Sequence, residues 1–137
     1  MGIFDKLVDK IFDETGKVME KAVDKIVEKT GADLSLEGIA RRSQAIEYFR
    51  RVLSNNINQY EVKENTTIGG VSYIFGIYQE KRLLAVINLL DENMDDKPIY
   101  LKAKETVEKE GVAFIDFYLD MPNEEEYIID KINSSIN

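Results

Sequence analysis

Apolar residues recur in pairs three or four positions apart over residues 3 to 29, and charged residues fill the gaps between the pairs. This spacing places the apolar side chains on one side of a helix, so it predicts an amphipathic helix or a helical hairpin. The apolar stripe consists of Ile3, Phe4, Leu7, Ile11, Phe12, Val18, Val23 and Ile26. We expect the stripe to contact a protein surface, either on the following domain or on a second copy of the chain.

The same segment contains an internal repeat. FDKLVDKIFDETG (residues 4–16) and MEKAVDKIVEKTG (residues 19–31) are identical at seven of thirteen positions and lie fifteen residues apart. Both copies end in Thr-Gly, and glycine commonly ends a helix. A break at Gly16 would give two short helices, whereas one continuous helix would carry Gly16 at a cost of about 1 kcal/mol relative to alanine. The sequence leaves both forms open, and we treat residues 1–31 as one segment and residues 32–137 as a separate domain.

The hydrophobic period changes several times after this segment. The predicted elements are a helix over 35–55, strands over 60–68, 71–78 and 83–90, a helix over 99–110, a strand over 112–119 and a helix over 124–132, with residues 134–137 expected to fray. The strand over 83–90 is almost entirely apolar, which is typical of a strand in the middle of a sheet. A strand that returns through a helix usually lies parallel to its predecessor. We therefore expect an α+β fold: the amphipathic segment, then an α-β-β-β-α-β-α domain whose mixed sheet is flanked by helices.

The composition excludes several classes of function. The 137 residues include no cysteine and no histidine, so disulfides, thiolate zinc sites, thiol nucleophiles and histidine-based triads are absent. The 26 acidic residues against 18 basic ones give a net charge of −8, which repels a phosphate backbone and argues against strong nucleic-acid binding. Four arginines, at positions 41, 42, 50 and 51, are expected on a solvated or partner-pairing helix face. We find no secretory signal and no apolar run long enough to span a membrane, so a cytoplasmic protein is expected.

Two acidic features and two tyrosines remain as candidates. Residues 91–96 begin like a calcium-binding loop, but the sixth position lacks glycine and the twelfth lacks glutamate, so we expect a solvated loop with a weak divalent-ion site as the alternative. Asp116 stands in an apolar strand, where an outward-facing or capped carboxylate is expected and a catalytic acid with a raised pKa is the alternative. Tyr73 and Tyr78 are expected to pack on the sheet, with a groove lining as the alternative.

One family resemblance rests on two segments. YIFGIYQEKRLLAVINLL (residues 73–90) and KAKETVEKEGVAFIDF (residues 102–117), together with the order of elements, resemble the PD-(D/E)XK, or restriction-endonuclease-like, superfamily and its short Vsr-like members over residues 35–134. The resemblance implies a magnesium ion held by an acid on one strand and a Glu-x-Lys-type pair on the next. In this chain those positions hold Ile74, Asn88 and Leu90. The resemblance therefore implies a nuclease fold without nuclease chemistry.

We accordingly expect a non-enzymatic binding or self-association protein that uses no cofactor or metal. Its partner would be another protein or a second copy, contacted through residues 3–29, and a homo-oligomer is expected. One alternative is a divergent metal-dependent nuclease, for which the candidates are Asp91, Asp95, Asp116 and the helix residue Lys104. Another is a membrane-surface adaptor, although seven acids offset six lysines in residues 1–31 and leave no cationic excess for anionic lipid.

Overall fold

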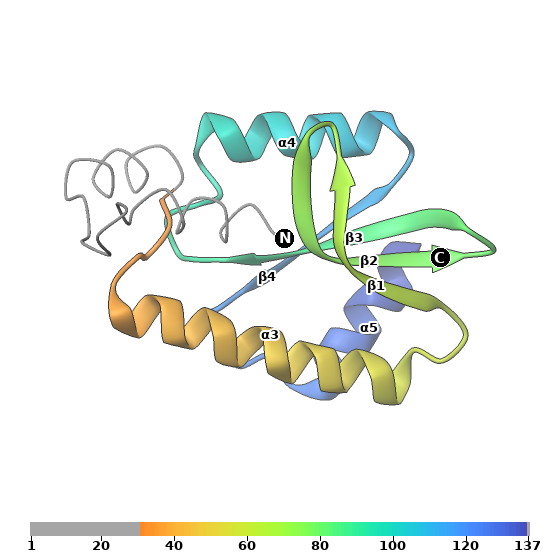
Figure 1. Cartoon of the computed structure of the whole chain (residues 1–137), viewed down its shortest axis with the longest axis horizontal. Helices are drawn as coiled ribbons and strands as arrows, with labels where there is room; N and C mark the ends of the chain where they lie inside the picture. The colour runs from red at the N-terminus through yellow and green to blue at the C-terminus, as the bar shows by residue number, and fades with distance from the viewer. Residues whose placement is uncertain (1–30, 137) are drawn as a thin grey trace, which may run out of the picture.

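A computed structural model describes residues 31–136, which form a four-stranded mixed sheet with helices on both faces (Figure 1). The elements are α3 (Leu36–Asn56), β1 (Glu61–Ile68), β2 (Val71–Gln79), β3 (Arg82–Leu90), α4 (Pro98–Lys109), β4 (Ala113–Tyr118) and α5 (Glu125–Ile136). The predicted α+β class and the order of the elements from residue 35 onward are confirmed. The predicted amphipathic segment over residues 3–29, with its one or two helices, lies outside the described residues.

The strands follow one another across the sheet in the order β1-β2-β3-β4. β1 and β2 are antiparallel, as are β2 and β3, whereas β4 lies parallel to β3 and is reached through α4. The interior position predicted for the apolar strand over residues 83–90 is confirmed, because β3 lies between β2 and β4. The parallel register places Asn88 directly opposite Asp116.

The element boundaries follow from local signals. The hydroxyl of Ser35 accepts a hydrogen bond from the amide of Gly38 at 3.0 Å and so caps the start of α3. Gly111 has a φ of 74°, the left-handed conformation that commonly follows a helix and that glycine adopts without strain. The helix predicted over residues 124–132 is longer than expected, and the fraying expected over residues 134–137 is wrong for residues 134–136, while residue 137 lies outside the described residues. α5 continues to Ile136 because Ile132 is fully buried and Ile136 packs against the same core.

The main core lies between the sheet and the two helices α3 and α5. Phe49 of α3 meets Phe117 of β4 edge-on, with ring centroids 5.0 Å apart. Ile77 from β2 and Ile128 and Ile132 from α5 are each 0% exposed within this core. This face of the sheet is therefore covered by side chains of α3 and α5.

A smaller cluster lies on the opposite face, beneath α4. It contains Tyr73, Val86, Val107 and Val112, with Phe114 packed against it. The tip of the β1–β2 hairpin bends towards α4, as Figure 1 shows, and a Cβ added at Gly69 in that tip would lie 2.6 Å from a methyl carbon of Thr106 in α4. The first half of β2 thus leaves the plane that its second half shares with β3.

Candidate functional site

The site follows from an incomplete pairing between two central strands. The pairs between β2 and β3 run from Phe75 opposite Ile87 to Gln79 opposite Arg82, and Val71, Ser72 and Tyr73 are paired with β1 instead. The carboxyl end of β3, from Asn88 onward, continues its register with β4. The two strands are therefore apart where β2 runs from residue 71 to 74 and β3 runs from residue 88 to 90.

A cavity of about 450 Å³ lies at this separation, between α3, the β1–β2 hairpin, the end of β3 and α4. Its volume falls in the range of about 300–1,000 Å³ that is typical of small-molecule sites. The apolar lining consists of Leu34, Ile39, Ile46, Val71, Ile74, Ile87, Leu89, Leu90, Met94, Ile99, Ala103 and Phe114. The polar lining consists of Asp33, Arg42, Ser43, Arg50, Glu64, Asn65, Ser72, Tyr73, Asn88 and Tyr100.

The charged residues that line the cavity are all held in ion pairs. Asp33 Oδ2 lies 2.8 Å from Arg41, Arg42 lies 3.3 Å from Asp91, and Arg50 lies 2.7 Å from Glu64. The first and third pairs are exposed at the rim, whereas the second is buried. Each charge on the lining therefore already has a counter-charge.

The buried pair fastens α3 to the loop that follows β3. Arg42 is 8% exposed and Asp91 is 7% exposed, and the Asp91 oxygen that pairs with Arg42, Oδ2, also accepts a hydrogen bond from the amide of Asp33 at 3.0 Å. The sulfur of Met94 lies 3.6 Å from the Arg42 guanidinium and 3.2 Å from the amide of Asp91. Burial lowers the pKa of Arg42, and the carboxylate of Asp91 opposes that shift. Of the two alternatives expected for the arginine face, solvated or partner-pairing, the solvated one is wrong for Arg42, because its position on α3 faces this loop.

A second polar cluster lies beside the cavity on the α4 face of the sheet. Asp116 accepts a hydrogen bond from the Asn88 amide at 3.3 Å and another from the hydroxyl of Tyr100. Lys131 of α5 donates to the backbone carbonyl of Asp116. Burial raises the pKa of the Asp116 carboxyl, while the bond from Tyr100 and the charges of Lys104 and Lys131 partly oppose this rise. Asp116 is thus a half-buried and capped carboxyl group.

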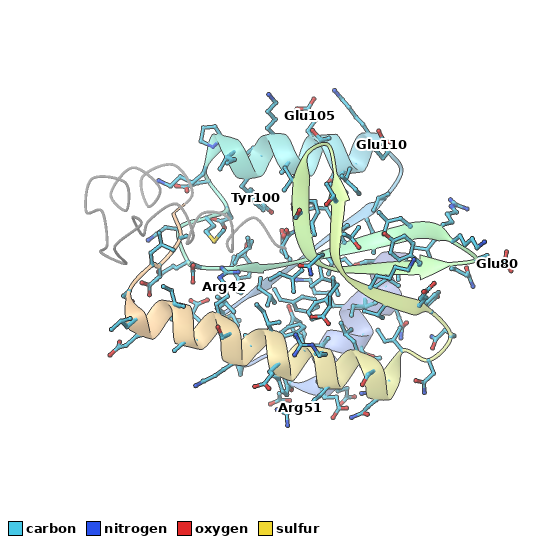
Figure 2. All side chains as sticks on the ribbon, in the orientation of Figure 1. Arg42, Arg51, Glu80, Tyr100, Glu105 and Glu110 are labelled. Atoms are coloured by element: carbon cyan, nitrogen blue, oxygen red, sulfur yellow. The ribbon has the colours of Figure 1, made fainter. Side chains whose placement is uncertain are left out.

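Tyr100 connects this cluster to the cavity. Its side chain comes from the first turns of α4 and Arg42 comes from α3, and Figure 2 shows both beside the end of β3. Burial and the hydrogen bond to Asp116 raise the pKa of the Tyr100 phenol. The hydroxyl therefore stays protonated and acts as a donor.

Tyr73 lines the cavity together with two other aromatic residues, Tyr100 and Phe114. Its ring meets that of Phe114 edge-on at 5.8 Å, and Phe114 in turn meets Tyr100 at 5.6 Å. Tyr73 is 4% exposed, and its hydroxyl oxygen is buried with no hydrogen-bond partner among the described residues. Burial, and to a smaller degree the charge of Asp116, raise the pKa of Tyr73 to about 12.

Several of the residues singled out from the sequence lie either on the cavity or in the polar cluster around Asp116. The three positions that the resemblance assigns to metal chemistry, Ile74, Asn88 and Leu90, all line the cavity. Asp116 accepts hydrogen bonds from Asn88 and Tyr100, and the charge of Lys104 partly opposes the rise in its pKa. Tyr73 lines the cavity, whereas the hydroxyl of Tyr78 lies 3.3 Å from that of Thr66.

The acidic loop does not converge on one point. Asp91 turns inward to Arg42, and Asp95 accepts a hydrogen bond from the hydroxyl of Tyr118 at 3.2 Å. Within residues 31–136 no three acidic side chains are grouped so that they could hold a metal ion. The oxygens of Asp91 and Asp95 are therefore used in two separate contacts.

Two residues at these clusters, Tyr100 and Lys131, escaped the sequence reasoning because no motif marked them. Arg42 was named only as part of a solvated or partner-pairing helix face, with no link to Asp91. Tyr100 carried one usable signal, because Tyr100, Ala103 and Val107 are spaced as one face of a helix and that face meets the sheet. The contact of Arg42 with Asp91 joins residues 49 positions apart, and no local pattern encodes it.

Comparisons with known proteins add no relative. No protein-family model matches the chain, and searches of curated proteins and of solved structures return no match. Among the helices of residues 31–136, none has the length and hydropathy needed to cross a membrane.

Proposed function

We propose that this chain is a non-enzymatic binding protein whose α/β domain binds through the cavity between β2 and β3, on a scaffold similar to a catalytically degenerate endonuclease. One observation carries the proposal. Ile74, Asn88 and Leu90 occupy the positions that the resemblance reserves for metal ligands, and all three line the same mainly apolar cavity. Magnesium requires several oxygen ligands, and the isoleucine and leucine side chains supply none. The position therefore favours an apolar occupant over a hydrated ion.

The proposed function is tested by measuring dye binding before and after a larger side chain is placed in the cavity. Nile red, an uncharged dye that fluoresces in apolar surroundings, is titrated into the full chain. Ala103 lines the cavity from α4, whereas Leu101 on the same helix is 53% exposed. We expect Ala103→Phe to abolish dye binding and Leu101→Phe, the matched control, to retain it. Equal binding by the two variants would locate the dye elsewhere and contradict the proposed function.

The proposal includes self-association through the apolar stripe over residues 3–29. The full chain is compared with a Phe4→Glu/Phe12→Glu variant by sedimentation velocity. Thr15→Glu/Thr30→Glu adds the same charge off the stripe and serves as the control. We expect the wild type and the control to sediment as an oligomer and the stripe variant as a monomer. A monomeric wild type would exclude this part of the proposal, and flotation of the full chain with liposomes would instead support a membrane-surface adaptor.

A divergent nuclease is the competing proposal, and Asp116 is the observation that favours it. A half-buried carboxyl group with a raised pKa beside Lys104 and Lys131 resembles the environment of a general acid. The full chain is incubated with labelled single- and double-stranded DNA and RNA in Mg²⁺ or Mn²⁺. We expect no cleavage above a protein-free blank. Cleavage that disappears in Asp116→Ala or Asp91→Ala would reverse the choice between the two functions.

A further inference from the structure

The chain enters the described domain beside the cavity. A Cβ added at Gly31 would lie 2.0 Å from the backbone oxygen of Asn93, so the chain passes directly against the loop that follows β3. Ala32 is 1% exposed, and the next two residues, Asp33 and Leu34, line the cavity. The residues before Gly31 therefore leave the domain within a few residues of the cavity wall.

Apolar side chains are exposed on this side of the molecule. Ile99 lines the cavity from the first turn of α4 and is 41% exposed, so the cavity reaches the surface there. Leu36, at the start of α3, is 88% exposed and lies one turn before Ile39 of the cavity lining. Figure 1 shows that α3 and α4 both begin on the side where the described chain begins. We name the surface of Leu36, Ile39 and Ile99 the mouth of the cavity, and apolar side chains packed on it would remove it from water.

The second copy of the sequence repeat, residues 19–31, is the part of the amphipathic segment nearest to this mouth. Gly31 has a φ of 71°, the left-handed conformation that commonly follows the last residue of a helix. Val23 and Ile26 of the apolar stripe lie eight and five residues before Gly31, which corresponds to about 12 and 8 Å along a helix. Phe12 of the first copy lies nineteen residues before Gly31, or about 28 Å along a continuous helix. The second copy therefore has the shorter path to the mouth.

The charges at the end of the second copy fit the loop beside the mouth. Lys29 lies two residues before Gly31, and Lys25 lies one helical turn earlier. The loop that Gly31 contacts exposes three acidic side chains, those of Glu92, Asp95 and Asp96. Exposed ion pairs contribute only about 0.2–1 kcal/mol, and the second copy as a whole carries as many acids as lysines. Charge therefore orients the end of the segment, and apolar contacts supply most of the affinity.

We propose that the apolar stripe of the second repeat copy packs over the mouth of the cavity in its own chain and competes there with an apolar ligand. This inference rests on the proposed function, because it states how access to the same cavity is controlled. The first copy, which contains Phe4 and Phe12, stays available for self-association. The two copies of the repeat thus have different contacts.

Cross-linking tests the packing directly. The chain has no cysteine, so two introduced thiols are the only ones that a short bismaleimide can join. We expect Ile26→Cys/Ile99→Cys to cross-link within one chain, because the proposal places these two side chains together. Ile26→Cys/Glu110→Cys is the matched control. Glu110 is exposed, lies about 16 Å further along α4 than Ile99, and is at the far end of that helix from Tyr100 in Figure 2.

Gel mobility and the masses of the linked peptides distinguish the outcomes. A cross-link within one chain for the Ile99 pair, and little for the Glu110 pair, supports the inference. A cross-link that forms only between two chains would identify a second copy as the occupant of the mouth and overturn it. Equal yields for the two pairs, or no cross-link for either, would also overturn it.

Dye binding tests the competition. Val23→Glu/Ile26→Glu places charges on the stripe and should release the second copy from the mouth. A mouth covered in about nine of ten molecules raises the apparent dissociation constant about tenfold. We therefore expect this variant to bind Nile red about tenfold more tightly than the wild type. Lys17→Gln/Lys21→Gln changes the net charge by the same amount on the polar side of the predicted helix, and it should bind as the wild type does.

The outcomes also separate this inference from the proposed function. Unchanged dye affinity in Val23→Glu/Ile26→Glu, with binding that still depends on Ala103, would overturn the inference and leave the function supported. Absence of dye binding in every variant would contradict the proposed function, and the cross-link yields would then support or overturn the packing on their own. Circular dichroism of each variant confirms that it is folded.

Discussion

The two halves of β2 lie in different surroundings although they belong to one strand. Ile77, in the second half, pairs with β3 and is 0% exposed in the main core. Ile74, in the first half, is half-buried and lines the cavity where β2 has left β3. Both are isoleucines three residues apart, so the difference comes from the path of the strand rather than from residue type. The second half of β2 is packed in the main core, and the first half borders the cavity.

The bend between the two halves coincides with a close approach at Gly76. A Cβ added there would lie 2.2 Å from the hydroxyl oxygen of Thr66, which is 5% exposed on β1. The absence of a side chain at Gly76 leaves room for Thr66 of the neighbouring strand β1 to pack against β2 at this point. Gly76 therefore lies close to the point where the half of β2 in the main core joins the half that borders the cavity.

The matched isoleucines give the largest expected effect. Ile77→Ala is expected to lower the free energy of unfolding by about 4 kcal/mol, because it opens a void in a closed core. Ile74→Ala is expected to lower it by only about 1 kcal/mol, since that side chain is already beside a cavity. Urea denaturation followed by circular dichroism measures both. Similar losses would show that the first half of β2 is packed as tightly as the second.

The ion pairs on α3 extend the comparison to electrostatics. Asp91→Ala leaves the Arg42 guanidinium buried without its carboxylate and is expected to cost about 3 kcal/mol. Arg50→Ala breaks the exposed pair with Glu64 and is expected to cost about 0.5 kcal/mol. A double variant, Arg42→Met/Asp91→Leu, should recover most of the first loss. If both single variants unfold at the same urea concentration, the buried pair does not fasten the loop.

Gly76 tests the junction between the halves. Gly76→Ala is expected to cost about 2 kcal/mol, because the new methyl group overlaps Thr66. Adding Thr66→Ala removes the overlap and should restore part of that loss in a double-mutant cycle. Additive losses in the cycle would show that the two residues do not meet.

The smallest effect concerns the carboxyl group behind the open half. Burial raises the pKa of Asp116 in the folded state above its unfolded value. The folded state therefore holds the proton more tightly, so stability is fully present below the unfolded pKa and declines as pH rises through the folded pKa. Asp116→Asn cannot titrate, so its stability relative to wild type should increase from pH 3 to pH 7 in thermal unfolding scans. A constant difference would show that the carboxyl group titrates normally.

The fold followed from the sequence where local signals were strong. The helix ends predicted near residues 35, 99 and 110 lie close to local signals that the structure uses, at Ser35, Pro98 and Gly111. The apolar run over residues 83–90 placed β3 inside the sheet. The end of α5 was misjudged, since Ser134 and Asn133 are weak helix formers and the burial of Ile132 that extends the helix is a tertiary contact. Helix propensity and capping residues therefore predict a helix end that depends on local contacts, and they do not predict one that depends on tertiary packing.

The site was predicted only in part. The family resemblance pointed to Ile74, Asn88 and Leu90 as the expected ligand positions, and the structure places all three on one cavity. It did not separate a buried Arg42 from its exposed neighbour Arg41, because adjacent helix residues differ in burial only through what faces them. It also left Tyr73 and Asp116 each with two alternatives.

By itself the sequence determined the order of helices and strands, the interior position of β3 and the absence of thiol and imidazole chemistry, because periodicity and composition are properties of local stretches of chain. Only the tertiary structure decided that β2 pairs with β3 from residue 75 onward and not before it, that Arg42 is buried against Asp91 and that the hydroxyl of Tyr73 has no partner among the described residues. These features depend on contacts between segments tens of residues apart. Such contacts follow from how the layers pack and leave no periodic signal in any one of them.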